Sequence, residues 1–398
     1  MLKILWITPK WTLPLLDGAR IATDSLVRSV VNTGAIVDNV CVSDSFDGIE
    51  VEELISRWSI REVKLVSRTK LDSLVKKLSF HFKTILKKTN LPLTFAYFHE
   101  EKTRLSVCEF IEKNDYDVIV LDALHLGTLF VDSNRFAFIR PQTKAKFILR
   151  SHNVEFELWD EARKRNHFPL NIILKWQRNK VLNLEKLITQ SVDGVASISI
   201  EDKDKTINVM NPKKIECFPL GFDFSKPLSF ENINKEQFLF VGRLDWPPNK
   251  DGLEWLLREV WPQVTARRPT AKLKIVGSGD RSWLAGYSHL KNVNVVGFIN
   301  NINDAYLDSA FTLVPMFYGS GTRIKVLESF VKNRPLISTR MGVQGANLLE
   351  TDYINAETPQ QWIDIMSTIE FDQEKMRALE SSRLKVEGNF SEKKVGVK

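Results

Sequence analysis

Short runs rich in β-branched residues alternate with longer amphipathic segments along this chain, and the whole pattern occurs twice. Expected strands in the first half lie at 3–7, 36–42, 62–66, 117–121, 146–150 and 194–199. Those in the second half lie at 238–242, 272–276, 293–296, 311–314 and 335–338. Helical periodicity fits 21–33, 70–88, 99–113, 155–190, 251–267, 322–332 and 358–387. The alternation predicts parallel α/β sheets, and a chain of 398 residues predicts two domains.

The boundary between the two domains is expected near residue 222. Residues 218–227 contain two prolines and a glycine, a polar stretch follows at 231–236, and a new strand begins at Phe238. We predict an N-terminal domain over 1–221, a C-terminal domain over 222–371, and a helical segment over 372–398 that is a candidate to cross back to the first domain. Two α/β units joined in this way would form a cleft between the carboxyl ends of their sheets, where ligands bind.

Composition narrows the class of protein. Hydrophobic residues make up 43% of the chain and charged residues 26%, which is typical of a soluble globular protein. The three cysteines lack zinc-ligand or redox spacing and indicate a reducing cytoplasm. The apolar run at residues 1–8 is short and is followed by Pro9, so we interpret it as the first strand and not as a signal peptide. No stretch approaches the ~20 apolar residues of a membrane span.

Positive charge is concentrated in two regions of the first half. The net charge is +7; residues 61–90 hold nine Lys and Arg against two acids, and residues 161–190 hold seven against two. Such patches suit a membrane surface, a phosphorylated acceptor or nucleic acid. The expected helix at 70–88 is basic and amphipathic. It would either pack in the core with solvated lysines or dock on an anionic membrane that carries a lipid-linked acceptor.

The segment from residue 315 to residue 328 gives the strongest indication of a binding site. A buried strand ends at Pro315, and a loop containing Gly319 and Gly321 leads into a helix. Glycines allow close backbone approach, and a helix start offers N–H groups and a positive dipole end to an anion.

Three charged side chains follow in the first turns of that helix. Arg323 and Lys325 oppose the helix dipole, so a bound phosphate would explain their placement. Glu328 shares a face with Lys325 and suits hydrogen bonding to a sugar diol. An ordinary strand, turn and helix with a Lys–Glu surface pair is the alternative interpretation.

A similar arrangement follows the first strand of the second half. A glycine turn after residues 238–242 carries Arg243, and Lys250 stands at the start of the next expected helix. Fixed cations of this kind would stabilise the charge of a departing diphosphate. The alternative is that both are solvated loop cations.

The first half offers its own candidates where strands end. Gly18 opens the helix after the first strand, and His152 follows the strand at 146–150. A histidine there would lie at the carboxyl edge of the sheet, while the neighbouring Asn153 would serve equally as a helix N-cap. Asp122 ends the preceding strand, and His125 is a nearby competitor.

The segment Gly319-Ser-Gly-Thr-Arg-Ile-Lys-Val-Leu-Glu328 resembles the donor-site signature of the retaining GT-B glycosyltransferases of group 1 (family 4 type). The resemblance implies two Rossmann-like α/β/α domains facing each other across a cleft. It implies that Glu328 holds the donor ribose and that Gly319 and Ser320 form the loop beside the donor sugar. Relatives commonly carry a first glutamate where this chain has Ser320, so that contact is in question. The resemblance assigns the donor diphosphate to Gly18, Arg243, Lys250, Gly321, Thr322, Arg323 and Lys325.

On the acceptor side, the resemblance assigns His152 and Asp122 to catalysis. The implied reaction moves a hexose from a nucleoside diphosphate, UDP in preference to GDP, to a hydroxyl of a glycan or lipid-linked acceptor. The anomeric configuration is kept and front-face attack is expected, because no enzyme nucleophile is evident. The implied role is synthesis of cell-surface polysaccharide or glycolipid, in the cytoplasm, with attachment to the inner face of the membrane as a further option.

We expect no metal, no cofactor and no nucleic-acid partner. Two Asp-x-Asp sequences, Asp115-Tyr-Asp117 and Asp202-Lys-Asp204, have the form that binds manganese in the other large glycosyltransferase fold, and we interpret both as solvated turn acids. A nucleotide-sugar epimerase on the same fold is an alternative, as is a basic protein that binds an anionic polymer without catalysis. A Rossmann dehydrogenase is disfavoured, since no Gly-x-Gly-x-x-Gly follows the first strand.

Overall fold

The computed structural model describes residues 1–15, 18–46, 48–70, 73, 79–80, 84, 89–231, 233–319 and 322–395. The chain forms two compact units, Met1–Leu220 joined by Val395, and Gly221–Lys394. The expected helix at 70–88 lies almost entirely outside the described residues, as do Ser320 and Gly321. No described helix has the length and apolar character needed to cross a membrane.

The first unit contains a seven-stranded parallel sheet. Its strands, in spatial order, are β3 (Glu62–Ser67), β2 (Ile36–Ser43), β1 (Lys3–Thr8), β4 (Val118–Asp122), β7 (Lys146–Ser151), β8 (Gly194–Ser197) and β9 (Ile215–Cys217). A small antiparallel pair, β5 (Val131–Asp132) and β6 (Ala137–Phe138), lies apart from it. The order places β1, β4 and β7 side by side, so the loops after these strands share one edge of the sheet.

Helices cover both faces of this sheet because successive strand residues point to opposite sides. In β1, Leu5 and Ile7 belong to the core beneath α4 and α7, whereas Ile4 and Trp6 belong to the core beneath α1 and α2. The helices are α1 (Gly18–Val31), α2 (Val51–Trp58), α4 (Glu101–Lys113), α5 (Leu124–Gly127), η1 (Thr128–Phe130), α6 (Glu155–Arg165), α7 (Leu170–Ser191) and α8 (Ile200–Met210).

The second unit is built in the same way around a six-stranded parallel sheet. Its strands, in spatial order, are β12 (Val293–Gly297), β11 (Lys272–Val276), β10 (Asn234–Val241), β13 (Ser309–Val314), β14 (Leu336–Ser338) and β15 (Ile354–Asn355).

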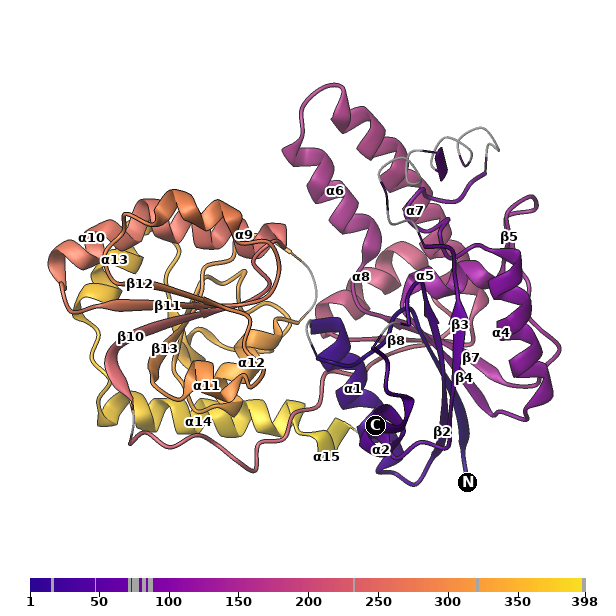
Figure 1. Ribbon diagram of the computed structural model, residues 1–398, viewed down its shortest axis with the longest axis horizontal. Helices are drawn as coiled ribbons and strands as arrows, with labels where there is room; N and C mark the ends of the chain where they lie inside the picture. The colour runs from indigo at the N-terminus through magenta and orange to yellow at the C-terminus, as the bar shows by residue number, and fades with distance from the viewer. Residues whose placement is uncertain are drawn as a thin grey trace. The chain divides into compact units, whose positions relative to one another are not determined.

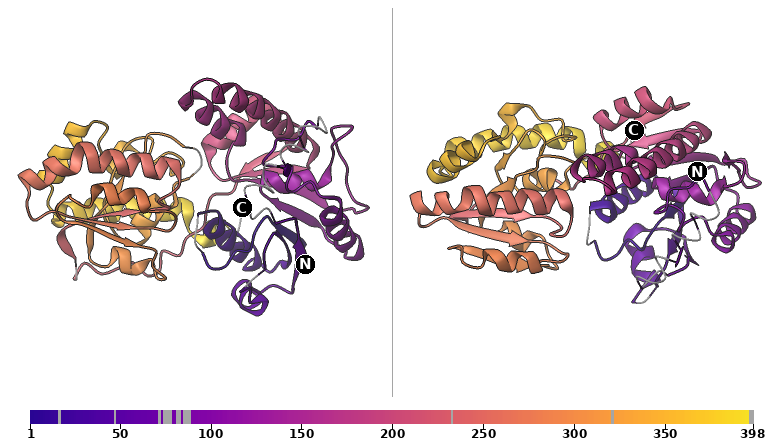
Figure 2. Two further views of the ribbon diagram at one scale, coloured as in Figure 1. Left: turned by 45° about the horizontal axis from the view of Figure 1, so that its top comes forward. Right: turned by 90° about the horizontal axis from the view of Figure 1, so that it is seen from above.

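Helices also lie on both faces of this second sheet, with α9, α10 and α13 on one side and α11, α12 and α14 on the other (Figure 1). Figure 2 shows the same unit from two further directions. The helices are α9 (Pro247–Trp255), η2 (Leu256–Val260, a π-helical turn), α10 (Trp261–Arg267), η3 (Ser282–Tyr287), α11 (Asn303–Tyr306), α12 (Ile324–Val331), η4 (Glu350–Asp352), α13 (Pro359–Thr368), α14 (Gln373–Phe390) and α15 (Glu392–Val395).

The α/β class predicted from the sequence is confirmed, and several helices differ from expectation. The helix expected at 155–190 is two helices, α6 and α7, separated at residues 166–169. The helix expected at 358–387 is also two, because Asp372 begins α14 and accepts a hydrogen bond from the Lys375 N–H. Helix α2 was not expected.

The C-terminal residues belong to both units. Helix α14 packs against α12 and belongs to the second unit, whereas Val395 belongs to the apolar core that contains β1. The division between the units falls after Leu220, one residue before the expected boundary.

Candidate functional site

Two loops of the second unit meet because their strands are neighbours. Strands β10 and β13 pair in parallel, with Phe240 opposite Leu313, so the loops that leave their carboxyl ends share one edge of the sheet. The first loop leads into α9 and the second into α12. The two predicted motifs, each a glycine-bearing loop before a helix, therefore lie at the same edge of the sheet.

Lys325, in α12, contacts the loop and helix that follow β10. Its Nζ donates to Asn249 Oδ1 at 2.6 Å, and Asn249 Nδ2 in turn donates to the Arg243 carbonyl at 2.9 Å. Gly242 lies beneath both, with φ of +159°. A Cβ atom at Gly242 would lie 2.6 Å from Asn249 Nδ2 and 2.9 Å from Lys325 Nζ. A side chain at this position would therefore displace the lysine ammonium and the amide from the positions they hold.

The Lys325 ammonium is buried in an environment that disfavours its charge. The side chain is 8% exposed, and Nζ lies 4.7 Å from the centre of the Phe240 ring. Burial, reinforced by repulsion from Arg323, lowers the pKa of Lys325 to about 7. Glu328 counteracts this in part by favouring the charged form.

The start of α12 holds the other cation of this motif. Arg323 is buried and is the N-cap residue of α12. A Cβ atom at Gly319 would lie 3.2 Å from Arg323 Nη2, and φ at Gly319 is +123°. Thr322 is half-buried, and its hydroxyl donates to the Gly345 carbonyl at 3.1 Å. Ser320 and Gly321 lie outside the described residues.

Arg243 and Lys250 lie at the same sheet edge but are held differently. Arg243 is more than half exposed and forms a two-bond ion pair with Asp245, at 2.6 and 2.9 Å. Lys250 Nζ lies 5.5 Å from the centre of the Trp283 ring. Helix α9 begins at Pro247, four residues earlier than expected, so Lys250 is already within its first turn.

Glu328 lies one turn deeper in α12. Tyr306, a fully buried residue, donates its hydroxyl to Glu328 Oε2 at 3.5 Å. Burial raises the pKa of Glu328, and the charge of Lys332 acts against that rise. A carboxylate held in this way can accept hydroxyl hydrogen bonds.

In the first unit, Asp122 is a fully buried carboxylate with four donors around it. Oδ2 accepts from Trp6 Nε1 at 2.9 Å and from Thr23 Oγ1 at 2.6 Å. Oδ1 lies 2.6 Å from Arg150 Nη1 and 2.5 Å from His152 Nε2. Burial opposes ionisation, but Arg150 and His152 together hold the pKa of Asp122 well below its usual range. Asp122 therefore fixes other side chains in place.

His152 borders a cavity of about 360 Å³ at the carboxyl edge of the first sheet. The imidazole is mostly buried, and burial together with Arg150 lowers its pKa, against the opposite effect of Asp122. Because Nε2 lies against Asp122, a neutral ring that donates there keeps its lone pair on Nδ1. The cavity is lined by Thr8, Pro9, Lys10, Thr12, Ala19, Arg20, Thr23, Arg68, Phe98, Asp122, Ala123, His125, His152, Asn153 and Glu155. Gly18, the first residue of α1, is exposed and adjacent to this lining.

Two features of this cavity were missed by sequence reasoning. Ala123 has φ of +140° and ψ of 155°, a region that is essentially reserved for glycine. Glu155 lines the cavity, and burial raises its pKa to about 7. Glu185 lies behind it and accepts from the N–H groups of Glu155 and Phe156 at 3.0 and 3.1 Å, which anchors the start of α6. Burial, with added repulsion from Glu155, raises the pKa of Glu185 to about 8.

His125, the alternative candidate to Asp122 on the acceptor side, packs against two aromatic rings. It stacks on Phe95 with the ring centres 4.2 Å apart and contacts Phe98 at 5.5 Å. Burial, with repulsion from His152, lowers its pKa to about 4. His125 is therefore neutral near pH 7 and forms part of the cavity wall.

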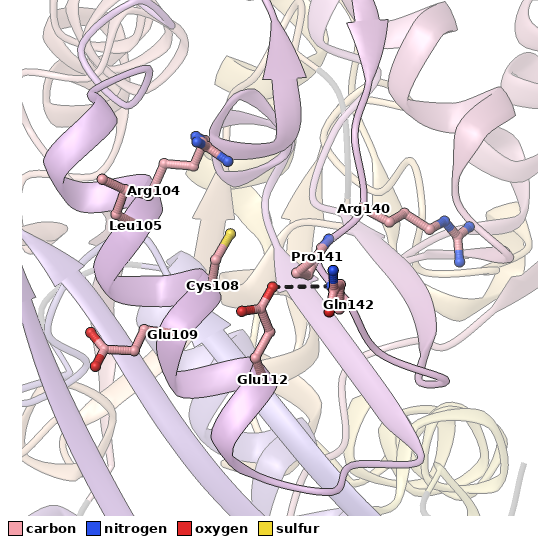
Figure 3. A pocket seen from close by; sticks show the side chains of 8 residues that line it. All are labelled: Arg104, Leu105, Cys108, Glu109, Glu112, Arg140, Pro141 and Gln142. Atoms are coloured by element: carbon pink, nitrogen blue, oxygen red, sulfur yellow. Dashed lines mark hydrogen bonds between the residues drawn. The ribbon is translucent and has the colours of Figure 1, made fainter.

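A second hollow, of about 340 Å³, lies beside α4 (Figure 3). Its two arginines are paired, Arg104 with Glu101 at 2.6 Å and Arg140 with Asp193 at 2.7 Å. Its lining comes from α4 and from the loop that precedes β7, and it contains none of the predicted site residues.

Among the described residues, no three His, Cys, Asp or Glu side chains are grouped so as to hold a metal ion. Asp115 and Asp117 are exposed, as expected. The interpretation of Asp202 as a solvated acid is wrong, because Asp202 is buried in the first turn of α8, where burial raises its pKa.

Comparison of the sequence with known families gives a match over residues 235–369, to the family described as Glycosyl transferases group 1. A protein from Klebsiella pneumoniae, described as an uncharacterized 44.6 kDa protein in the cps region, is 24% identical over 363 residues. The alignment covers 87% of this chain and 84% of that protein.

Solved structures share the fold at low sequence identity. Sucrose-phosphate synthase from Thermosynechococcus elongatus has a TM-score of 0.73 at 16% identity, covering 100% of this chain and 97% of that one. HepE from Anabaena, in complex with UDP and glucose, has a TM-score of 0.65 at 13% identity, covering 100% and 98%. The fold expected from the sequence, two Rossmann-like α/β/α domains of the GT-B type, and the resemblance to group 1 are both confirmed.

Proposed function

We propose, from the premise that this chain is a GT-B glycosyltransferase of the group 1 family, that it transfers a hexose from a nucleoside diphosphate to an acceptor hydroxyl with retention of configuration. The donor is a UDP-sugar in preference to a GDP-sugar. The acceptor is a glycan or lipid-linked sugar in polysaccharide synthesis, the role that the cps-region relative favours.

The observation that carries this proposal is the buried charge of Lys325. Within the described part of the chain, no carboxylate forms an ion pair with this ammonium, and the only side-chain hydrogen bond it makes goes to the neutral Asn249. A buried cation without a counter-ion is unfavourable. A diphosphate placed at the start of α12 would supply the missing negative charge.

The remaining residues of the second unit have complementary proposed roles. Arg323, Lys325 and the N–H groups at the start of α12 stabilise the negative charge that develops on the departing diphosphate. Arg243, Lys250 and Thr322 border the same group, and Glu328 accepts the ribose hydroxyls. Because these cations are fixed parts of the protein, the reaction needs no metal ion.

In the first unit, His152 is the proposed contact to the donor sugar, through a hydroxyl that donates to the Nδ1 lone pair. Asp122 is a positioning residue, since its oxygens are already engaged by Trp6, Thr23, Arg150 and His152. The backbone N–H of Gly18 is the proposed contact from this unit to the donor phosphate.

In the reaction itself, the acceptor oxygen bonds to the anomeric carbon as the bond from that carbon to the diphosphate breaks. The proton of the acceptor hydroxyl passes to a phosphate oxygen of the leaving group. Both events occur on one face of the sugar, so the configuration is retained without an enzyme nucleophile. The enzyme works in the cytoplasm.

Thermal unfolding in the presence of UDP, GDP and ADP tests the donor site. We expect the largest increase in Tm with UDP, and an absence of any increase with all three would refute the proposal. Glu328→Ala should remove most of the increase, whereas Glu380→Ala, on the exposed face of α14, should not. Hydrolysis of a panel of nucleotide sugars would then identify the sugar.

A further inference from the structure

Large apolar side chains are exposed together where α6 connects to α7. Their exposed fractions run from 42% for Trp176 to 79% for Phe168, and the members are Phe168, Leu170, Ile172, Ile173 and Trp176. Five such residues within nine positions form a cluster, and clustered apolar surface on a protein marks an interaction site. We call residues 163–180 the hairpin tip.

Helix α7 already contributes one face to the core of the first unit. Gln177, Val181 and Leu184 are buried on the side of the helix that faces the sheet. At about 100° per residue, Ile172 lies about 180° and Trp176 about 140° around the helix from Val181, on the outer side, whereas Ile173 lies about 80° from it. Figure 1 shows α6 and α7 side by side, with the connection between them at the end away from the sheet. Ile172 and Trp176 are therefore not part of the core-facing stripe of an ordinary amphipathic helix.

Positive charge surrounds this apolar set. Residues 162–184 contain six Lys and Arg and no Asp or Glu. Three of the six, Arg163, Lys164 and Arg178, form ion pairs of 3.0–3.9 Å with Asp160 or Glu161, which come just before this stretch. Lys164, Arg165 and Lys175 are exposed, whereas Lys180 Nζ lies 4.4 Å from the Trp176 ring centre and donates to the Thr89 carbonyl at 2.5 Å. Apolar residues that include Trp and Phe, flanked by cations, are the composition of a surface that lies in a membrane interface.

We propose that the hairpin tip docks the protein on an anionic lipid bilayer. The apolar side chains enter the boundary between headgroups and acyl chains, and the cations contact lipid phosphates. A second copy of the chain fits less well, since a symmetric contact would bring six Lys and Arg of each copy together, a charge that Asp160 and Glu161 offset only in part. Nucleic acid would use the cations but not the exposed aliphatic side chains.

This inference goes beyond the proposed function and concerns a different surface from the one predicted by sequence. The sequence offered the helix expected at 70–88 as a candidate for membrane docking, with packing in the core as the alternative, whereas the hairpin tip begins eleven residues after His152. It does not depend on which nucleotide sugar is used. An enzyme held there would reach an acceptor anchored in the same bilayer.

Co-sedimentation of the full chain with vesicles tests the proposal. We expect binding to vesicles of phosphatidylcholine mixed with phosphatidylglycerol, little binding to phosphatidylcholine alone, and weakening by salt. The triple variant Phe168→Ser, Ile172→Ser and Ile173→Ser should bind the anionic vesicles at least about tenfold more weakly than the original chain. The control variant Leu105→Ser with Leu384→Ser removes exposed leucines elsewhere and should bind like the original chain.

The cations are tested separately. Replacing Lys164, Arg165 and Lys175 by Gln should lower binding to the anionic vesicles by roughly fivefold per charge. The UDP-induced increase in Tm should stay the same in all these variants, which keeps failure of docking distinct from failure of the donor site. Absence of vesicle binding by the original chain would overturn the proposal. So would equal binding by the triple variant, or a dimer in solution that the triple variant dissociates.

Discussion

Lys325 makes binding of the nucleotide sugar depend on pH in a direction that can be measured. Burial and repulsion by Arg323 lower the pKa of Lys325 to about 7 in the structure. A diphosphate beside the ammonium favours its charged form and raises that pKa again. Binding at pH 8 should therefore take up close to one proton per nucleotide sugar, most of it on Lys325.

The magnitude follows from the pKa of the empty site. Above about pH 7 the lysine must gain a proton before it can neutralise the diphosphate, so affinity falls towards tenfold per pH unit and is roughly 100-fold lower at pH 9 than at pH 6. The stability of the empty protein changes in the opposite sense. A lysine in the unfolded chain titrates near ~10.4, so between about pH 7 and that value the unfolded state binds more protons, and this group makes the free energy of unfolding rise with pH.

Isothermal titration calorimetry with UDP-glucose, in two buffers of different ionisation enthalpy, measures the proton uptake directly. A nucleotide sugar is preferable to UDP because a terminal phosphate itself titrates near pH ~6. Lys325→Arg keeps its charge throughout and should abolish most of the uptake. Lys332→Arg is the matched control, since Lys332 is a second lysine with a pKa lowered by burial.

Other groups titrate in the same range, and the variant separates them. Burial raises the pKa values of Glu155 to about 7 and of Glu185 to about 8, but both glutamates are retained in Lys325→Arg. The difference between the two proteins therefore belongs to Lys325. If UDP-glucose binds the original chain with no proton uptake and with constant affinity from pH 6 to 9, the diphosphate does not lie beside this lysine.

Three further predictions concern the backbone and the buried charges. Asp122→Asn should lower the free energy of unfolding of the first unit by roughly 3–5 kcal/mol in urea, because it leaves a buried arginine without its carboxylate, whereas Asp115→Asn, at an exposed position, should change it little. Gly242→Ala should abolish the UDP-induced rise in Tm, since its Cβ would lie 2.6 Å from Asn249 Nδ2, and a normal rise would contradict the tight fit. Ala123→Gly should increase the free energy of unfolding by about 1 kcal/mol by relieving the φ of +140°, and an unchanged urea midpoint would contradict the strain.

The strands could be predicted well from the sequence because each is a compact β-branched run that a parallel sheet buries on both faces. The strand expected at 146–150 is β7, Lys146–Ser151, and that at 272–276 is β11. Helix ends were harder. Pro169 lies inside the expected helix at 155–190 and was a local signal of the break between α6 and α7. The break before α14 depends on capping by Asp372, a weaker signal within a continuous helical pattern.

The candidate site divides along similar lines. Arg323, Lys325 and Glu328 were found because a glycine loop before a helix is a local pattern. Asn249 was missed because its role, to accept a hydrogen bond from the Lys325 ammonium, involves a residue 76 positions away in the sequence.

Long-range contacts also explain what was missed in the first unit. Asp122 is held by Trp6, 116 residues away, and Glu185 anchors a helix that begins 30 residues earlier. The strain at Ala123 leaves no trace in composition, since alanine is ordinary at the end of a strand.

The chain passes between its two units only after Leu220 and before Val395, and each unit has its own sheet and its own apolar core. The proposed donor-nucleotide residues from Arg243 to Glu328 all lie between those two points, while His152 and the hairpin tip lie outside them. Genetic recombination with both crossovers at these positions would exchange the proposed donor-nucleotide residues together and leave the sheet and core of the first unit unchanged. Laboratory chimeras with a homologous chain should place both junctions there.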